Sequence, residues 1–204
     1  MKTTERSFTK LNELIYFKAP NLGAFSLSKR MYFCIMSDLL TNKVAESGIV
    51  SVDLASFLSN NEICLFDIKP YLFMELMLKE KDFRTALSSL DWSIYKDKVV
   101  GIFCSADAII PMWANMLIVS GLQPFAKAIY FGDEDKTRAQ FLLDQINTIN
   151  LSDYADQRVV VKGCGETPIN ESAYVAITQK LRPVVKSIMY GEPCSTVPVY
   201  KRKD

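Results

Sequence analysis

The chain has 204 residues, of which 24 are Lys or Arg, 23 are Asp or Glu and none is His. Apolar residues make up 49% of the chain, an ordinary value for a globular protein with one sizeable core. The lack of imidazole excludes Ser-His-Asp and Cys-His catalysis, His general bases and His-bearing zinc motifs. Any chemistry must come from thiols, carboxylates, amines, hydroxyls, backbone groups or a bound cofactor.

The net charge of +1 and the scattered basic residues argue against nucleic-acid binding. The longest apolar stretch, Ala108–Leu122, contains Pro111 and Asn115 and is shorter than the roughly 18 residues that a membrane span needs. The apolar run at 14–17 is too short for a signal peptide. Five widely spaced cysteines fit a reducing compartment. We therefore expect a cytoplasmic protein without nucleic-acid or membrane partners, and its oligomeric state stays open.

The N-terminal segment differs from the rest in charge. Residues 1–35 have a net charge of +4, whereas the remaining residues have a net charge of −3. Met36 is followed by Ser37 and Asp38, a good N-cap and first-turn charge for a predicted helix that runs to about Ser47 and is stopped by Gly48. We expect Met36 to be the physiological start, 1–35 to be a non-native leader or a disordered arm, and 36–204 to form a single domain.

The first half of that domain has a mixed pattern. Short β-rich runs at Ile49–Val52 and Ile63–Ile68 predict two strands. The apolar segment Tyr71–Leu78 is ambiguous between helix and strand. Apolar residues at helical spacing predict an amphipathic helix over Glu80–Leu90. The sequence thus predicts an N-terminal α+β segment packed on the rest of the domain.

The second half alternates strands and helices. Strands are predicted at 99–103, 128–131, 158–162 and 184–190, and helices at 111–120, 137–149 and 171–181. Gly121 is expected to lie just past the end of the first of these helices, and Asn170 to cap the last one. Alternation at this spacing predicts βαβ units, because parallel strands need crossover connections. The predicted fold class is α/β, with a mostly parallel sheet and flanking helices.

Three cysteines follow predicted strands directly. Cys104, Cys164 and Cys194 each lie just beyond a strand's carboxyl end, and in a parallel sheet those ends share one edge. A flavodoxin-like strand order 2-1-3-4 would make the three strands neighbours, roughly 5 Å apart. Thiolates suit zinc and iron-sulfur clusters. The sequence therefore predicts a metal site at this edge, holding zinc or an iron-sulfur cluster.

Other residues at the same predicted edge complete the candidate site. Asp107 and Glu192, with Glu166 as a further candidate, would supply a fourth ligand. Three glycines would let the backbone come close to sulfur or to an anion, and two serines are expected to bind a ligand. These positions are Gly163, Gly165, Gly191, Ser105 and Ser195.

Two alternatives remain beside metal binding. One thiol, foremost Cys194, could act as the nucleophile of a small enzyme or as a sulfur carrier, because glycine donors and a helix N-terminus lower a thiol pKa. The three cysteines could also be packing groups of an interaction module without catalysis, since buried cysteine is common. Cys64, inside an apolar alternation, is expected in the core. Whether the chain is an enzyme is left open.

Four segments resemble a bacterial family known only as domain of unknown function 2480. They are DIKPYLFMELMLKEKDFR from Asp67, CSADAIIPMWA from Cys104, VVVKGC ending at Cys164, and LRPVVKSIMYGEPCSTVPVYK from Leu181. The resemblance covers about residues 38 to 203 and implies no activity. Family members are often encoded beside genes of the sulfur-mobilisation iron-sulfur assembly system. The resemblance therefore implies an accessory role in iron-sulfur or metal homeostasis, with iron-sulfur assembly proteins as partners.

Overall fold

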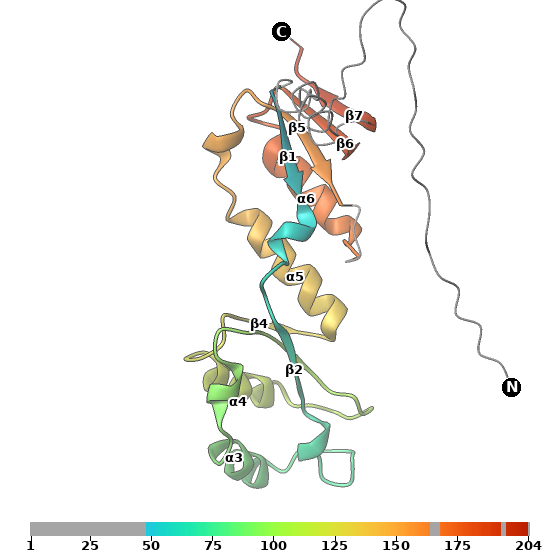
Figure 1. The fold of residues 1–204 in the computed structure, drawn as a ribbon. Helices are drawn as coiled ribbons and strands as arrows, with labels where there is room; N and C mark the ends of the chain where they lie inside the picture. The colour runs from blue at the N-terminus through green and yellow to red at the C-terminus, as the bar shows by residue number, and fades with distance from the viewer. Residues whose placement is uncertain (1–47, 164–167, 193–194, 204) are drawn as a thin grey trace, which may run out of the picture. The chain divides into compact units, whose positions relative to one another are not determined.

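The strands form two sheets, one four-stranded and one three-stranded, in the part of the chain that the computed structural model describes (Figure 1). It describes residues 48–163, 168–192 and 195–203, all within a unit that spans 43–204. The predicted leader and the predicted helix after Met36 lie outside the described residues. Both sheets are mostly parallel and helices flank them, so the predicted α/β class is confirmed.

The four-stranded sheet has the order β1-β5-β6-β7. Its strands are β1 (Ile49–Asp53), β5 (Arg158–Lys162), β6 (Ser187–Glu192) and β7 (Ser195–Lys201). The first three are mutually parallel, and β7 returns antiparallel along β6. The sequence reasoning did not predict β7. This strand tolerates Pro198 because it lies at the edge of the sheet, where a missing N–H leaves no neighbour unpaired.

The three-stranded sheet is wholly parallel, with the order β2-β3-β4. Its strands are β2 (Ile63–Asp67), β3 (Val99–Phe103) and β4 (Ala128–Phe131). The central strand β3 reads VVGIF, and its first four residues are buried. A continuous apolar run is expected there, because the central strand of a parallel sheet is covered on both faces.

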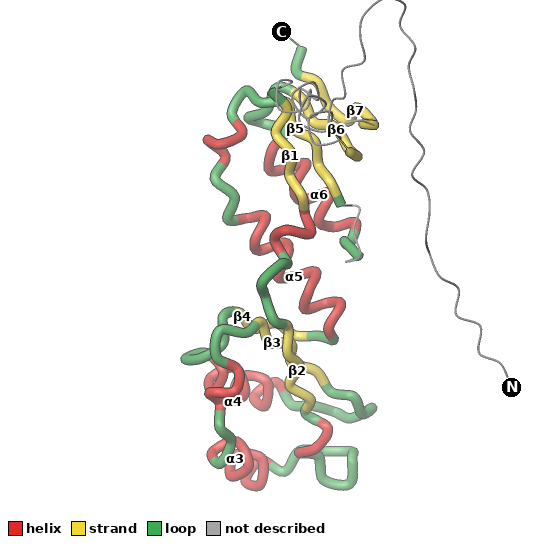
Figure 2. Tube along the Cα trace, viewed as in Figure 1, coloured by secondary structure: helices red, strands yellow, loops and turns green. Residues whose placement is uncertain are grey.

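Four α-helices lie within the described residues (Figure 2). They are α3 (Glu80–Ser88), α4 (Met112–Leu122), α5 (Glu134–Asn147) and α6 (Glu171–Leu181). Short 3-10 helices occupy four connections: η1 (Leu54–Phe57), η2 (Lys69–Tyr71), η3 (Trp92–Tyr95) and η4 (Leu151–Tyr154). None of these helices is long and apolar enough to span a membrane.

Side-chain caps fix where α5 and α6 begin. The carboxylate of Asp133 accepts a hydrogen bond from the Lys136 amide, so α5 starts three residues earlier than the apolar spacing predicts. Asn170 caps α6 by accepting from the Ser172 amide, as predicted. Acidic residues in the first turn of each helix favour the same ends through the helix dipole.

Helix α5 links the two sheets through one buried cluster. Phe141 and Ile146 of α5 share this cluster with Val159 of the four-stranded sheet and Val99 of the three-stranded sheet. The buried face of α6, including Ile177, belongs to the same cluster. Figure 1 shows α5 between the strands of the two sheets. This shared core joins the two sheets into one body.

A second buried cluster lies on the other face of the three-stranded sheet. Phe83 of α3 and Ile118 of α4 pack there against Phe66 and Ile102 of the strands. Gly121 lies inside α4, not past its end as the sequence predicted. A Cβ at this position would come within 2.5 Å of the Trp92 ring, so glycine is needed for close packing of η3 on α4.

The two-sheet arrangement corrects the predicted strand order. The strand before Cys104 is β3, in the three-stranded sheet, whereas the strands before Cys164 and Cys194 are β5 and β6, in the other sheet. Strands β5 and β6 are direct neighbours, as predicted, but β3 pairs with β2 and β4. Pattern alone predicts strands but not their partners, and for that reason one continuous sheet was expected.

Candidate functional site

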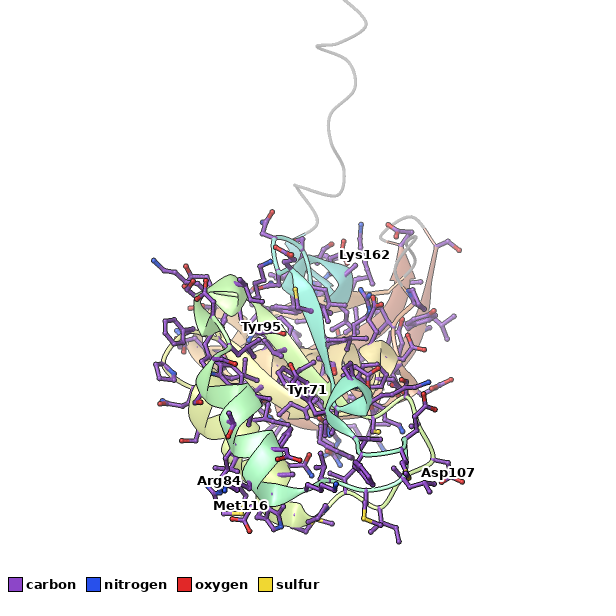
Figure 3. The ribbon with its side chains drawn as sticks, turned by 90° about the horizontal axis from the view of Figure 1, so that it is seen from below. Tyr71, Arg84, Tyr95, Asp107, Met116 and Lys162 are labelled. Atoms are coloured by element: carbon purple, nitrogen blue, oxygen red, sulfur yellow. The ribbon has the colours of Figure 1, made fainter. Side chains whose placement is uncertain are left out.

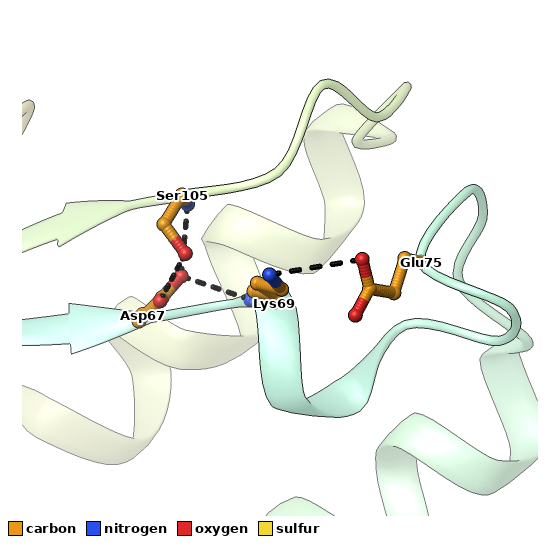
Figure 4. Close-up of polar contacts among 4 residues, drawn as sticks. All are labelled: Asp67, Lys69, Glu75 and Ser105. Atoms are coloured by element: carbon orange, nitrogen blue, oxygen red, sulfur yellow. Dashed lines mark hydrogen bonds and ion pairs between the residues drawn. The ribbon is translucent and has the colours of Figure 1, made fainter.

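At the carboxyl end of the three-stranded sheet, Asp67 joins β2 to the loop after β3 (Figure 4). Its Oδ1 accepts hydrogen bonds from the Lys69 amide at 2.9 Å and the Ser105 amide at 3.0 Å. Its Oδ2 accepts from the Ser105 hydroxyl at 2.6 Å. The Lys69 ammonium lies 3.6 Å from Glu75 Oε2. Ser105, a predicted ligand-binding residue, is therefore engaged in linking two strand ends.

These contacts change the acidity of Asp67. Burial alone would raise its pKa, but the hydrogen bonds from Ser105 and Lys69 outweigh burial and hold the pKa below the ordinary value. They do so because each donor stabilises the charged form of the carboxyl. Asp67 is therefore ionised at neutral pH and acts as a fixed acceptor.

Cys104 and Asp107, two predicted metal ligands, lie beyond the end of β3. Cys104 is half-buried, has a free thiol and packs against the cluster beneath α3 and α4. Asp107 is exposed. Figure 3 shows Asp107 well apart from Lys162, which closes β5 of the other sheet. These two predicted ligands therefore belong to a different sheet edge from β5 and β6.

At the carboxyl end of the four-stranded sheet, a salt bridge joins β5 to β6. Lys162 Nζ lies 2.7 Å from Glu192 Oε2, and both side chains are partly exposed. Glu192, predicted as a metal ligand, thus has a cationic partner on the neighbouring strand. Its strand partner across the hairpin is Ser195.

Both described glycines of this edge are required by close packing. Gly191 has a φ of 118°, and a Cβ there would lie 2.6 Å from the Ser195 carbonyl oxygen. A Cβ at Gly163 would lie 1.7 Å from the Tyr174 hydroxyl oxygen. Tyr174, on α6, was not singled out by the sequence reasoning, because nothing in the pattern distinguishes a tyrosine on the apolar side of a helix from core. It brings a hydroxyl to the residue that precedes Cys164.

An apolar hollow of about 350 Å³ adjoins this edge. Tyr174 and Tyr190 line it, with their rings in an edge-to-face contact 5.7 Å apart, and Met189 and Val199 complete its wall. Tyr174 therefore borders both the hollow and Gly163. The end of β5 therefore adjoins both an apolar wall at Tyr174 and the ion pair of Lys162 and Glu192.

The described residues contain no group of three or more Cys, Asp or Glu side chains arranged to hold a metal. Cys164, Gly165 and Cys194, together with Glu166, lie outside the described residues, so the predicted ligand set stays a prediction.

Cys64 is half-buried on β2 rather than fully in the core. Its thiol donates to Glu62 Oε1 at 3.5 Å. Burial first, and then this hydrogen bond, raise the pKa of Cys64, so the thiol stays protonated and is a poor nucleophile.

The chain belongs to a family whose description is "Protein of unknown function (DUF2480)", which matches residues 38–202. No curated protein and no solved structure matches the chain.

Proposed function

We propose that this family member is an accessory protein that handles a soft metal ion or a metal–sulfur cluster through Cys164 and Cys194. The observation in favour is the parallel pairing of β5 with β6, from Arg158↔Ser187 to Val161↔Tyr190. Cys164 follows the last residue of β5 by two positions, and Cys194 follows the last residue of β6 by two positions. Neighbouring strands are about 4.8 Å apart, and two residues span about 7 Å, so both thiols can reach one ion.

The surroundings of these strand ends favour thiolate chemistry. A cation beside a thiol lowers its pKa, and the Lys162 ammonium lies at this edge in its pair with Glu192. The apolar wall at Tyr174 and Tyr190 lowers the polarity on one side, which strengthens charge interactions there. The Lys162 cation supports deprotonated thiols at neutral pH, which metal ligation requires.

Two thiolates leave a zinc ion or a cluster with open ligand positions. Cys104 follows a strand of the other sheet, and the Glu192 carboxylate is held by Lys162. Structural zinc takes four protein ligands, and clusters usually take four cysteines. An incomplete set fits a protein that passes its cargo to a partner, which would complete the coordination. Iron-sulfur assembly proteins are the partners that this proposal implies.

A second candidate function is sulfur transfer, favoured by the same Lys162 cation. In this case the thiolate of Cys194 attacks the outer sulfur of a donor persulfide. A new S–S bond forms on Cys194, the donor's S–S bond breaks, and the donor leaves as a thiolate. Cys164 would then release that sulfur by attacking the inner sulfur of the Cys194 persulfide, which leaves a Cys164–Cys194 disulfide and a hydrosulfide ion.

The test is anaerobic purification of the full chain, followed by metal and sulfide analysis and absorption spectra. We expect bound metal in the wild type and a loss of at least about ten-fold in affinity in Cys164→Ser and in Cys194→Ser. Cys64→Ser is the matched control, because its thiol is held protonated on β2. Cys104→Ser separates a two-thiol site, which it would leave intact, from the three-cysteine site predicted by sequence.

Three outcomes distinguish the alternatives. Metal-free protein that accepts sulfane sulfur on Cys194 would favour sulfur transfer. Equal metal loss in all four variants would contradict a specific site. Metal-free protein with unreactive thiols at both positions would refute both proposals.

A further inference from the structure

Helix α4 is apolar on both sides, which its place in the fold does not explain. Ala114, Ile118 and Leu122 are buried against the three-stranded sheet. The opposite side presents Met112 and Met116, the latter 71% exposed, and the helix contains no charged residue. Met116 lies at the periphery of the view in Figure 3. A helix that is apolar all round is normally buried on all sides.

A strained loop extends the same apolar surface. Met74 and Glu75 have φ values of 52° and 57°, which side-chain-bearing residues seldom adopt. Backbone bridges tie Phe73 to Met77, and Met77 to Ile109, which precedes α4 by three residues. The apolar side chains here are exposed: Met74 is 75% exposed and Ile109 is 86% exposed. Strain of this kind persists where a defined surface serves a function.

Six side chains, each more than half exposed, make up this surface, which we call the Met face: Met74, Leu76, Met77, Ile109, Met112 and Met116. At about 100 Å² each they present roughly 600 Å², most of the roughly 800 Å² that each partner contributes to a standard interface. Exposed apolar areas of this size mark interaction surfaces.

Asn115 supplies a second, independent observation on α4. Its Oδ1 is buried and has no hydrogen-bond partner in the described part of the chain. It lies next to the stripe of Met112, Met116 and Val119, which repeats at helical-seam spacing. A buried amide oxygen without a donor costs free energy. A change of the Asn115 rotamer on association would bring this oxygen within reach of the amide of a second Asn115 across a two-fold axis.

We propose that the Met face is the interface of a two-fold symmetric homodimer, in which α4 packs against α4 of a second copy. The surface is self-complementary in chemistry, as a two-fold contact requires: an apolar stripe meets an apolar stripe, and an amide meets an amide. Glu75, which lies between Met74 and Leu76, is paired with Lys69 at 3.6 Å. The six side chains of the Met face carry no charge, so none of them selects an acidic or a basic partner.

The test is the mass of the full chain in solution, by sedimentation velocity and light scattering from about 1 to 100 µM. The wild type is expected to have the mass of two chains. Met116→Glu and Ile109→Glu are expected to weaken the dimer by about a hundred-fold or more, because each places an unpaired charge in an apolar contact. Val175→Glu is the matched control: Val175 is also apolar and more than half exposed but lies on α6, and the dimer should persist.

Asn115→Asp gives a second readout, in which reversal with pH distinguishes dissociation of the dimer from a loss of folding. Two carboxylates facing each other cannot both ionise, so this dimer should dissociate above about pH 6 and reform on acidification. The proposal is overturned if the wild type has the mass of one chain at every concentration. A monomer whose Met face is protected from chemical footprinting by residues 1–47 would overturn it in the same way. It is also overturned if Met116→Glu and Ile109→Glu stay dimeric while Val175→Glu dissociates.

Discussion

Replacing Asp67 by Ala tests how the two strand ends of the three-stranded sheet are joined. The substitution removes three hydrogen bonds, from the Lys69 amide, the Ser105 amide and the Ser105 hydroxyl. Such bonds to a charged acceptor contribute about 1.5–3 kcal/mol each when fully buried, and less here because water reaches the freed amides. We expect a loss of about 2 kcal/mol in the free energy of unfolding at pH 7, measured by urea denaturation.

The control is Asp91→Ala. Asp91 makes the same kind of local contact, to the amide and hydroxyl of Ser93, but joins no distant segments. Its loss should therefore be clearly smaller. Equal losses in the two variants would refute the idea that Asp67 ties β2 to the loop after β3.

The pH dependence of the Asp67 contribution has a definite sign. Its folded pKa lies below the unfolded value of 3.8, chiefly through the Ser105 and Lys69 donors acting against burial. A depressed folded pKa stabilises the protein above the unfolded pKa, and this stabilisation is lost as the pH falls through the folded pKa. The difference between wild type and Asp67→Ala should shrink as the pH falls below about 4. A difference that stays constant down to about pH 2 would contradict the reasoning.

Two further predictions concern the core. Gly121→Val should destabilise the protein by about 1–3 kcal/mol in thermal or urea unfolding, since the added carbons collide with Trp92; Ser120→Val on the exposed side of α4 should not. Tyr130→Phe removes the hydrogen bond to Asp144 Oδ2 at 2.7 Å and should cost about 1 kcal/mol. Burial first, and then Asp144, raise the pKa of Tyr130, so wild-type stability should fall above about pH 10, and less steeply in Tyr130→Phe.

The sequence predicted the elements of the second half well because their patterns are local. Val99–Phe103 and Arg158–Lys162 are β-branched runs between turn residues, and Asn170 is a local cap. Strand β7 was missed because Pro198 and its exposed neighbours interrupt the apolar pattern of an edge strand. The sequence pattern indicates a helix stop at Gly121, but glycine is needed there because the Trp92 ring packs against it. Trp92 belongs to another segment, so this contact cannot be predicted from the local sequence.

The candidate site depended on non-local information, and there the sequence was less informative. Strand β1 pairs with β5, although all three strands of the other sheet lie between them in the sequence. Hydrophobic periodicity does not encode such a pairing. This pairing separates Cys104 from the edge where β5 and β6 end. The contacts of Asp67 with Ser105, and of Lys162 with Glu192, were likewise unpredictable without the strand neighbours.

The most direct test of the proposed thiol site is disulfide mapping of the full chain after mild oxidation. Cysteines whose Cα atoms lie within about 7 Å can form a disulfide. We predict a Cys164–Cys194 cross-linked peptide as the main product, with Cys104 and Cys64 recovered as free thiols. Cross-links from Cys104 to either residue, or reduced Cys164 and Cys194 after oxidation, would contradict a two-thiol site at the ends of β5 and β6.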